Sequence, residues 1–236
     1  MQIPDRLYRY RSAGSSLGYL LSEVRGLLWC SNAEFLNDPF DGLATVPVED
    51  VRRQIPMPGG YDYRVVAKQR WAAACFSEIW DNPAMWAHYA TYSGVCLCYD
   101  AQKLTELVAH RVNTTGSSSD IGSLVRVTYV NPMPTSFSDV GDALRTKTNV
   151  WEYEKEWRLL YRYHSPLDSP SRGKSLNLGT PMPNPCLREV ILGLTADEHT
   201  QMAIQDVLRE KTTDVIISKL RLDNSAGVLR RVPLAD

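Results

Sequence analysis

The sequence has 236 residues, of which 44% are hydrophobic and 22% are charged, and these values exclude a disordered or fibrous chain. The length suits one globular domain with a core large enough to sustain the fold. A formal net charge of −1, from 26 Lys plus Arg against 27 Asp plus Glu, excludes a global basic field for nucleic acid but leaves room for a local basic patch.

Hydrophobic periodicity predicts short strands and helices in the N-terminal part of the chain. This part of the chain is expected to begin with a strand, a helix and a second strand, followed by a turn in NDPFDG. Asn82 is placed to cap one helix and Asp100 to cap a later one. The expected elements are strand 7–11, helix 15–24, strand 26–31, an apolar run at 71–77, helix 83–90, strand 94–100, helix 101–109 and strand 123–130.

The C-terminal part alternates predicted strands with one clear amphipathic helix. Thr195 and Glu198 have the spacing of a capping box at the start of that helix, which is expected to run to about Lys211. Because short strands outnumber helices and several are consecutive, we predict a single α+β domain over residues 1–236. The expected elements are helix 136–147, strand 157–163, an exposed loop at 164–185, strand 188–193, the amphipathic helix that ends near Lys211, strand 214–220 and strand 228–234.

Several features indicate a cytoplasmic protein that does not enter a membrane. No apolar run approaches the ~20 residues that a bilayer-spanning helix needs, and the N-terminus lacks the apolar core of a signal peptide. The five cysteines are odd in number and most lie in apolar segments, as is typical of reduced, buried thiols. No metal site is expected, because the spacing of Cys and His fits none.

Four polar and aromatic clusters stand out from the plain sequence between them: LYRYRS, EFLNDPFDG, CFSE with MWAHYA, and WEYEKEWRLLY. A structural interpretation is available for each. The aromatic residues would be core residues, Asn37 and Asp38 would bond to their own turn, and Ser77 would end a strand. His88 would lie on a helix surface, and the glutamates would form a solvated charge run.

Two features favour a functional interpretation. Glu152, Glu154 and Glu156 alternate along the chain as they lead into a strand, so three carboxylates are expected to crowd one face and to raise one another's pKa. Such crowding is common where a carboxylate binds a ribose hydroxyl or acts as a base. Arg9 and Arg11 share one face of an otherwise apolar and aromatic strand, which suits binding of a phosphate or diphosphate.

The order LYRYRS, LNDPFDG, CFSE, MWAHYA, GVCLCYD and WEYEKEWR resembles an uncharacterised bacterial family, domain of unknown function 2971. The similarity extends from Leu7 to about Gly193, and LNDPFD with YEKEWR is its most specific combination. Members of that family are often found beside mobile elements and phage-defence genes. The resemblance therefore implies a role as a toxin or a phage-defence effector, with an antitoxin or another defence-system protein as a partner.

The chain is also similar, more loosely, to the ADP-ribosyltransferase fold. That resemblance implies NAD as a substrate and a nucleic acid or protein as the acceptor. It implies that Arg9 or Arg11 binds the diphosphate, that Ser77 orients the site, and that Glu156 binds the ribose while Glu154 activates the acceptor. The candidate catalytic residues are Glu156, Glu154 and Ser77, and the candidate NAD-binding residues are Arg9, Arg11, Tyr8, Tyr10, Asn37, Asp38, Trp86, His88, Tyr89 and Arg158.

Under this hypothesis, Glu156→Gln abolishes NAD consumption and leaves thermal stability nearly unchanged. Two other classes of function remain open. One is a non-catalytic module that senses a nucleotide or a phage component. The other is a metal-dependent nuclease that uses Asp38, Asp41 and the Glu154/Glu156 pair. Local basic groups that would fit a nucleic-acid acceptor are Arg52, Arg53, Arg64, Lys68, Arg70, Arg230 and Arg231.

Overall fold

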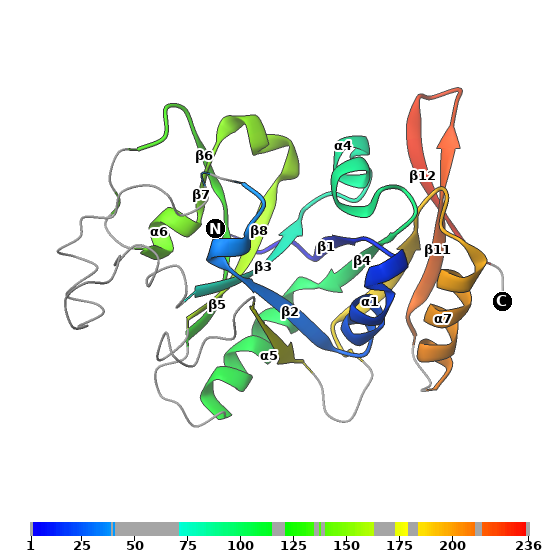
Figure 1. The fold of residues 1–236 in the computed structure, drawn as a ribbon, viewed down its shortest axis with the longest axis horizontal. Coiled ribbons are helices and arrows are strands. Elements are labelled where there is room, and N and C mark those ends of the chain that lie inside the picture. Colours follow the sequence, from blue (N-terminus) through cyan, green and yellow to red (C-terminus); the bar gives the residue numbers. More distant parts are fainter. Residues whose placement is uncertain are drawn as a thin grey trace. The chain divides into compact units, whose positions relative to one another are not determined.

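Figure 1 draws the helices and strands of the computed structural model. The structure describes residues 2–38, 40, 71–114, 121–134, 137, 140–162, 173–178, 184–210 and 214–234. The chain forms two units, each assembled from segments that are far apart in the sequence. Unit 1 comprises Met1–Leu28, Phe76–Leu107 and Leu176–Asp236, and unit 2 comprises Trp29–Cys75 and Val108–Ser175.

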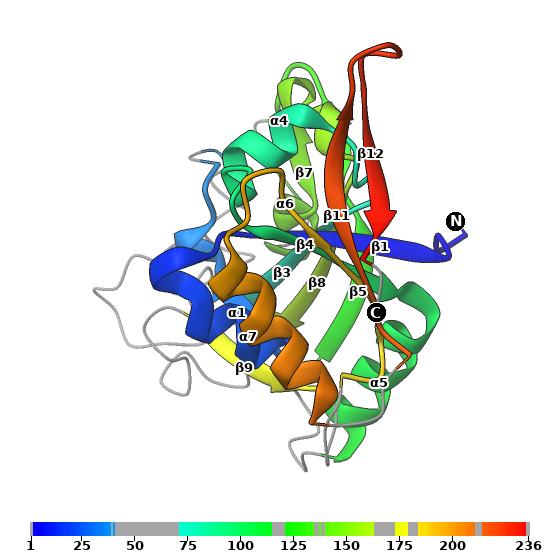
Figure 2. The ribbon, with the colours of Figure 1, turned by 90° about the vertical axis from the view of Figure 1, so that its right-hand side faces the viewer.

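Unit 1 is built on a sheet with the strand order β12-β11-β10-β4-β1. Only β10 and β11 run parallel, while the remaining neighbours in this order are antiparallel. The last residue of β3 (Trp71–Ser77) pairs with β1, since Ser77 lies opposite Tyr8. In Figure 2, β11 and β12 form the orange and red hairpin. The bounds are β1 Arg6–Arg11, β4 Val95–Asp100, β10 Leu187–Leu192, β11 Ile216–Asp223 and β12 Val228–Pro233.

Two helices of unit 1, α1 (Leu17–Val24) and α7 (Glu198–Arg209), pack against each other and lie side by side in Figure 2. α1 turns Leu20, Glu23 and Val24 inward, a spacing that places them on one helical face. The remaining helical segments of this unit are η1 (Gly14–Ser16), α4 (Pro83–Met85), the π-helix η3 (Trp86–Ala90) and the first half of α5 (Ala101–Thr114).

Gly94 and Gly18 differ sharply in the space around them, and both lie in unit 1. A Cβ atom on Gly94 would come within 2.1 Å of the Arg11 carbonyl oxygen, whereas one on Gly18 would meet nothing within 4 Å. We therefore expect Gly94→Ala to lower the free energy of unfolding by about 1–3 kcal/mol. Gly18→Ala, within α1, is expected to raise it by about 0.5–1 kcal/mol. Urea unfolding of both variants checks this, and equal effects would contradict the described backbone approach.

Unit 2 contains antiparallel strand pairs and a small parallel pair. β2 (Leu27–Asn32) pairs with β3 through Ser31 and Ala73, and β5 (Ile121–Arg126) pairs with β8 (Glu156–Arg162), which also pairs with β3. Ala33, Ala73, Val140, Ala143, Leu144 and Leu160 form its buried core. The other elements are η2 (Ala33–Phe35), β6 (Thr128–Val130), α6 (Val140–Leu144), β7 (Thr146–Thr148), η4 (Asn149–Glu154) and β9 (Gly173–Asn177).

The predicted α+β class is confirmed, and most predicted elements are found. The caps are correct at Asn82, whose side chain accepts from the backbone N–H groups of Ala84 and Met85, and at Asp100, which accepts from Lys103. The single domain over residues 1–236 stays a prediction.

Three details of the predicted secondary structure are wrong. The helix expected at 136–147 ends at Leu144, because the strand β7 begins at Thr146. The loop expected at 164–185 contains the strand β9. The cap of α7 is Asp197, which accepts a hydrogen bond from the Thr200 backbone N–H at 2.7 Å, rather than Thr195.

Candidate functional site

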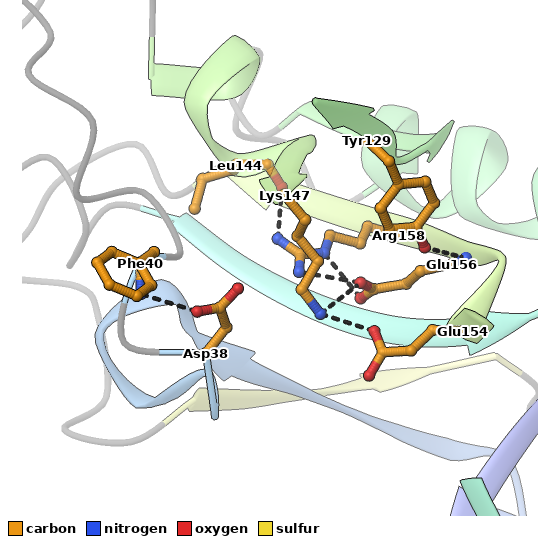
Figure 3. Close-up of polar contacts among 8 residues, drawn as sticks. All are labelled: Asp38, Phe40, Tyr129, Leu144, Lys147, Glu154, Glu156 and Arg158. Carbon is orange, nitrogen blue, oxygen red and sulfur yellow. Dashed lines mark hydrogen bonds and ion pairs between the residues drawn. The ribbon is translucent and has the colours of Figure 1, made fainter. Parts of the chain in front are cut away.

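Four ionisable side chains lie together in the interior of unit 2, as Figure 3 shows. β7 supplies Lys147, the end of η4 supplies Glu154, and β8 supplies Glu156 and Arg158. None of the four is more than 4% exposed. These four residues and Asp38, which lies beside them in Figure 3, are called the acidic centre below. With every group ionised, three carboxylates face two cations, so the centre has an excess of negative charge.

Arg158 holds the Glu156 carboxylate through two nitrogen atoms. Its Nε donates to Oε1 at 2.8 Å and its Nη2 donates to Oε2 at 3.1 Å. Its Nη1 donates to the Leu144 carbonyl oxygen at 2.6 Å, and the Glu156 backbone N–H donates to the Tyr129 hydroxyl at 2.8 Å. Because a guanidinium group is planar and these contacts are charge-assisted, Glu156 is held in one orientation.

Lys147 separates the two glutamates that the sequence places close together. Its Nζ lies 2.7 Å from Glu154 Oε2 and 3.0 Å from Glu156 Oε2. The same ammonium group lies 4.9 Å from the centroid of the Trp151 ring, within the range of a cation–π contact. The repulsion between the two carboxylates is therefore offset by a shared cation.

Glu156 remains ionised over a wide range of pH. Burial favours the neutral carboxyl, but Arg158 and Lys147 outweigh burial and lower the pKa of Glu156 from its ordinary 4.5 to about 2. The Cys75 thiol also donates a hydrogen bond to this carboxylate and contributes in the same direction. The prediction that crowding raises the pKa is wrong for Glu156, because it did not include these cations.

Asp38, from the LNDPFDG motif, supplies the least satisfied group of the centre. It is 3% exposed, and its Oδ1 accepts a hydrogen bond from the Phe40 backbone N–H at 2.9 Å, as predicted for a turn. Its Oδ2 is buried and has no hydrogen-bond partner among the residues that the structure describes. Figure 3 shows this oxygen directed toward Lys147 and Arg158. A buried carboxylate oxygen in this state is unfavourable unless a donor reaches it.

The prediction that Glu152, Glu154 and Glu156 crowd one face is wrong for Glu152. Residues 149–154 form the 3₁₀ helix η4, and Lys155 then adopts a left-handed backbone with φ 45°. Glu152 is exposed, whereas Glu154 and Glu156 are buried. The burial of Glu156 also changes the expectation for Glu156→Gln, which should lower stability because a neutral amide leaves two buried cations less well paired.

Arg9 and Arg11 of β1 converge on one buried carboxylate of α1 in unit 1. Their Nε atoms lie 2.7 Å and 3.1 Å from the two oxygens of Glu23, which has no exposed surface. The Tyr99 hydroxyl donates to Glu23 Oε1 at 3.1 Å, and the Arg9 guanidinium lies 5.5 Å from the Phe76 ring centroid. Arg9 is 6% exposed while the Arg11 side chain is 24% exposed, so Arg11 is the more accessible of the two.

The aromatic candidates of unit 1 form a packed group beneath η3. The rings of Tyr10 and Trp86 meet edge to face with centroids 5.3 Å apart. The Tyr10 hydroxyl donates to the Ile79 carbonyl oxygen at 3.0 Å, and the Trp86 indole donates to the Trp80 carbonyl oxygen at 2.7 Å. Both side chains are therefore anchored to the protein by their polar atoms.

The other candidates in unit 1 differ in exposure. Ser77 is fully buried, and its hydroxyl oxygen accepts from the Ile79 backbone N–H at 3.1 Å. Tyr8 is 7% exposed. His88 is exposed and Tyr89 half-buried, and their rings meet at 6.3 Å.

The candidate residues thus fall into two sets. Unit 2 brings Asp38, Glu154, Glu156 and Arg158 together and also contains Asn37, while Arg9, Arg11, Tyr8, Tyr10, Ser77, Trp86, His88 and Tyr89 belong to unit 1.

Sequence reasoning missed the partners of these residues, Glu23 and Lys147. Glu23 follows buried Leu20 by three positions, and a charged residue on the apolar face of a helix is a usable signal. For Lys147 the sequence contains no comparable pattern. The only indication is that the nearby glutamates, if buried, need a cation.

The metal-dependent nuclease would need a group of metal ligands. Among the described residues, no cluster of three His, Cys, Asp or Glu side chains is arranged to hold a metal ion. Six residues named from the sequence lie outside the described residues: Asp41, Arg52, Arg53, Arg64, Lys68 and Arg70.

Comparison with known proteins identifies one family. Residues 85–159 match the family described as "Protein of unknown function (DUF2971)". The match supports the predicted resemblance, over a shorter part of the chain than the expected Leu7 to about Gly193. The DUF2971 match includes Lys147, Glu154, Glu156 and Arg158, so the greater part of the acidic centre lies within it. No curated protein and no solved structure matches the chain. In the part of the chain that the structure describes, no helix has the length and apolar character to cross a membrane.

Proposed function

We propose that this DUF2971 protein binds a ribose nucleotide at the acidic centre, with NAD as the first candidate. The observation that carries the proposal is Asp38 Oδ2, a buried carboxylate oxygen without a hydrogen-bond partner among the described residues. Such an oxygen needs a donor, and the hydroxyl groups of a ribose are neutral donors that buried carboxylates bind in many nucleotide sites.

The chemistry around Asp38 supports a nucleotide rather than an anion alone. The centre carries an excess of negative charge, so a phosphate in direct contact with Asp38 would be repelled. Phe40 follows Asp38 closely, and its ring is 59% exposed. An exposed aromatic ring beside a hydroxyl-binding carboxylate suits a nicotinamide or a nucleobase, because bases stack on aromatic side chains.

A second candidate function is ADP-ribosyl transfer from NAD, and the low pKa of Glu156 favours it. In that reaction the bond between ribose C1′ and the nicotinamide nitrogen breaks, and nicotinamide leaves with the electron pair. The ionised Glu156 and the neighbouring Glu154 would stabilise the positive charge that develops at C1′. An acceptor O–H or N–H then forms the new bond to C1′ and gives its proton to a carboxylate or to water.

The acceptor and the biological partners are part of this second candidate. A nucleic acid or protein acceptor, a toxin or phage-defence role and an antitoxin partner are proposals that follow from the sequence resemblance. Diphosphate binding by Arg9 or Arg11, orientation by Ser77, and NAD contacts from Tyr8, Tyr10, Trp86, His88 and Tyr89 are further predictions for unit 1.

Asp38→Asn is expected to weaken NAD binding at least about tenfold, because it removes the charge of the oxygen that accepts from the ribose. The variant retains an oxygen for the Phe40 backbone N–H, so its stability should change by less than about 1 kcal/mol. Isothermal titration calorimetry with NAD measures the affinity. Glu152→Gln is the matched control, since it removes a negative charge from an exposed residue of the same unit.

The same samples separate the two candidate functions. Nicotinamide release from NAD is assayed with and without RNA, DNA and protein acceptors and with or without Mg²⁺. Release that depends on one of these acceptors would establish transfer. Binding without release would establish a nucleotide-binding module. Affinity that is unaffected by Asp38→Asn, or lowered equally by Glu152→Gln, would remove the acidic centre as the site.

A further inference from the structure

A row of polar side chains crosses one face of the unit 1 sheet. Of its residues, the sequence pointed only to Tyr8, as an NAD contact, and to Arg231, as a basic group for a nucleic-acid acceptor. Tyr8 of β1 lies opposite Cys98 of β4, and Cys98 lies opposite Glu189 of β10. Cross-strand partners project to the same face of a sheet, so these three side chains share one face. Ser218 of β11 and Arg231 of β12 extend the row through their contacts with Glu189.

Glu189 fixes the position of Arg231. Its side chain is buried, and its two oxygens accept hydrogen bonds from the Ser218 hydroxyl at 2.7 Å and from Arg231 Nη1 at 2.8 Å. The Arg231 guanidinium also lies 4.9 Å from the centroid of the Trp80 ring. With a carboxylate and an aromatic ring as supports, Arg231 is held in place although its side chain is 27% exposed.

The Tyr8 hydroxyl brings a second arginine to the same place. Arg6 and Tyr8 alternate along β1, so their side chains project to the face that also carries Cys98 and Glu189. Arg6 interacts electrostatically with Tyr8 and Glu189, and Arg231 interacts with the same two residues. The guanidinium groups of Arg6 and Arg231 therefore share the surroundings of Tyr8 and Glu189 on this face.

The charge of this group is not balanced by the described residues in contact with it. Glu189 forms an ion pair with Arg231, and no described acidic residue forms one with Arg6. Asp100 lies opposite Arg6 in the strand pair but forms its ion pair with Arg188, whose Nη2 lies 2.7 Å from Asp100 Oδ2. The group therefore has two guanidinium ions and one carboxylate. Because Arg6 is exposed, the group presents hydrogen-bond donors at the surface.

We propose that Arg6, Tyr8 and Arg231 form a binding site for a phosphate group. Two guanidinium groups at one place can donate several charge-assisted hydrogen bonds to the oxygens of a phosphate, and an arginine fork fits that geometry. The site lies wholly in unit 1 and does not depend on the acidic centre. It also distinguishes two neighbouring arginines, since Arg230 pairs with Asp223 at 2.5 Å whereas Arg231 belongs to the site.

The test uses calorimetric titration of the full chain with two probes that lack a ribose diol, inorganic pyrophosphate and 2′-deoxyadenosine 5′-phosphate. Arg6→Gln is the decisive variant, because Arg6 is exposed and its replacement leaves Glu189 paired. We expect it to weaken binding at least about tenfold. Arg230→Gln, on the same strand as Arg231, is the matched control and should change the affinity less than about twofold.

The two probes distinguish the source of the phosphate. Equal affinity for both would assign the site to a phosphate group alone, and tighter binding of the nucleotide would assign it to a nucleotide phosphate. Asp38→Asn should leave both affinities unchanged, which separates this site from the acidic centre. The proposal is overturned if the wild-type protein binds neither probe at millimolar concentration, if Arg6→Gln has no effect, or if Arg230→Gln has an equal effect.

Discussion

Arg158→Met is expected to lower the free energy of unfolding by about 3–5 kcal/mol, because it leaves a buried carboxylate without its main partner. Arg158 is 1% exposed and holds both oxygens of Glu156. It also donates to the Leu144 carbonyl oxygen, which would lose that partner. Methionine fills much of the vacated volume, so the loss reports on charge and hydrogen bonding more than on packing. Chemical unfolding in urea at neutral pH measures it.

Arg162→Met is the matched control, since Arg162 is a partly buried arginine at the end of the same strand. Its guanidinium carbon lies 5.8 Å from the centroid of the Trp71 ring, a cation–π contact at the long end of the range, so its replacement should change stability by less than about 1 kcal/mol. Adding Glu156→Gln to Arg158→Met should recover at least about 1 kcal/mol, because it removes the buried carboxylate that has lost its main partner. Additive losses in the double variant would contradict the described pairing.

The stability of the protein is expected to fall steeply in acid because of Glu156. Its pKa is lowered to about 2 in the folded state, below its ordinary value of 4.5, so the folded state binds this proton less readily than the unfolded state. The stabilising contribution is therefore present above about pH 4.5 and is lost as the pH falls from there toward 2. At about 1.4 kcal/mol for each pKa unit, its size is on the order of 3 kcal/mol.

Unfolding free energies of the wild type and of Glu156→Gln, measured from pH 6 down to pH 2.5, isolate this contribution. Other carboxylates contribute to the acid response as well, for example Asp100. Burial favours its neutral form, but hydrogen bonds from Lys103 and Arg188 outweigh burial and lower the pKa of Asp100. Because both proteins share those groups, only the difference between the two curves reports on Glu156. The difference should shrink as the pH falls, and parallel curves would show that Glu156 is not held ionised by its neighbours.

The sequence predicted the elements that carry strong local signals. Strand β1, the helix capped by Asn82, and strand β4 followed by the cap at Asp100 have alternation or capping residues that act over a few positions. The segment from Glu152 to Glu156 lacks such a local rule. Its alternation suggests a strand, but the chain forms η4 and turns at Lys155, so that two glutamates reach Lys147.

The partners of the candidate residues were harder to predict than the residues themselves. Arg9 was identified from its strand, but its partner Glu23 comes from a helix on another part of the chain. Glu156 was identified from its motif, but its charge state depends on Lys147, which lies on a different strand, β7. Pairings of this kind arise from tertiary packing, and one sequence without relatives to compare contains no direct signal for them.

Binding of a nucleotide ribose by Asp38 and its neighbours in the acidic centre can be observed in a crystal structure of the protein with NAD. We predict a ribose hydroxyl within about 2.6–3.2 Å of Asp38 Oδ2 and the nicotinamide or adenine ring beside Phe40. Asp38 Oδ2 bonded to a group of the protein itself, with NAD bound elsewhere or absent at saturating concentration, would contradict the claim.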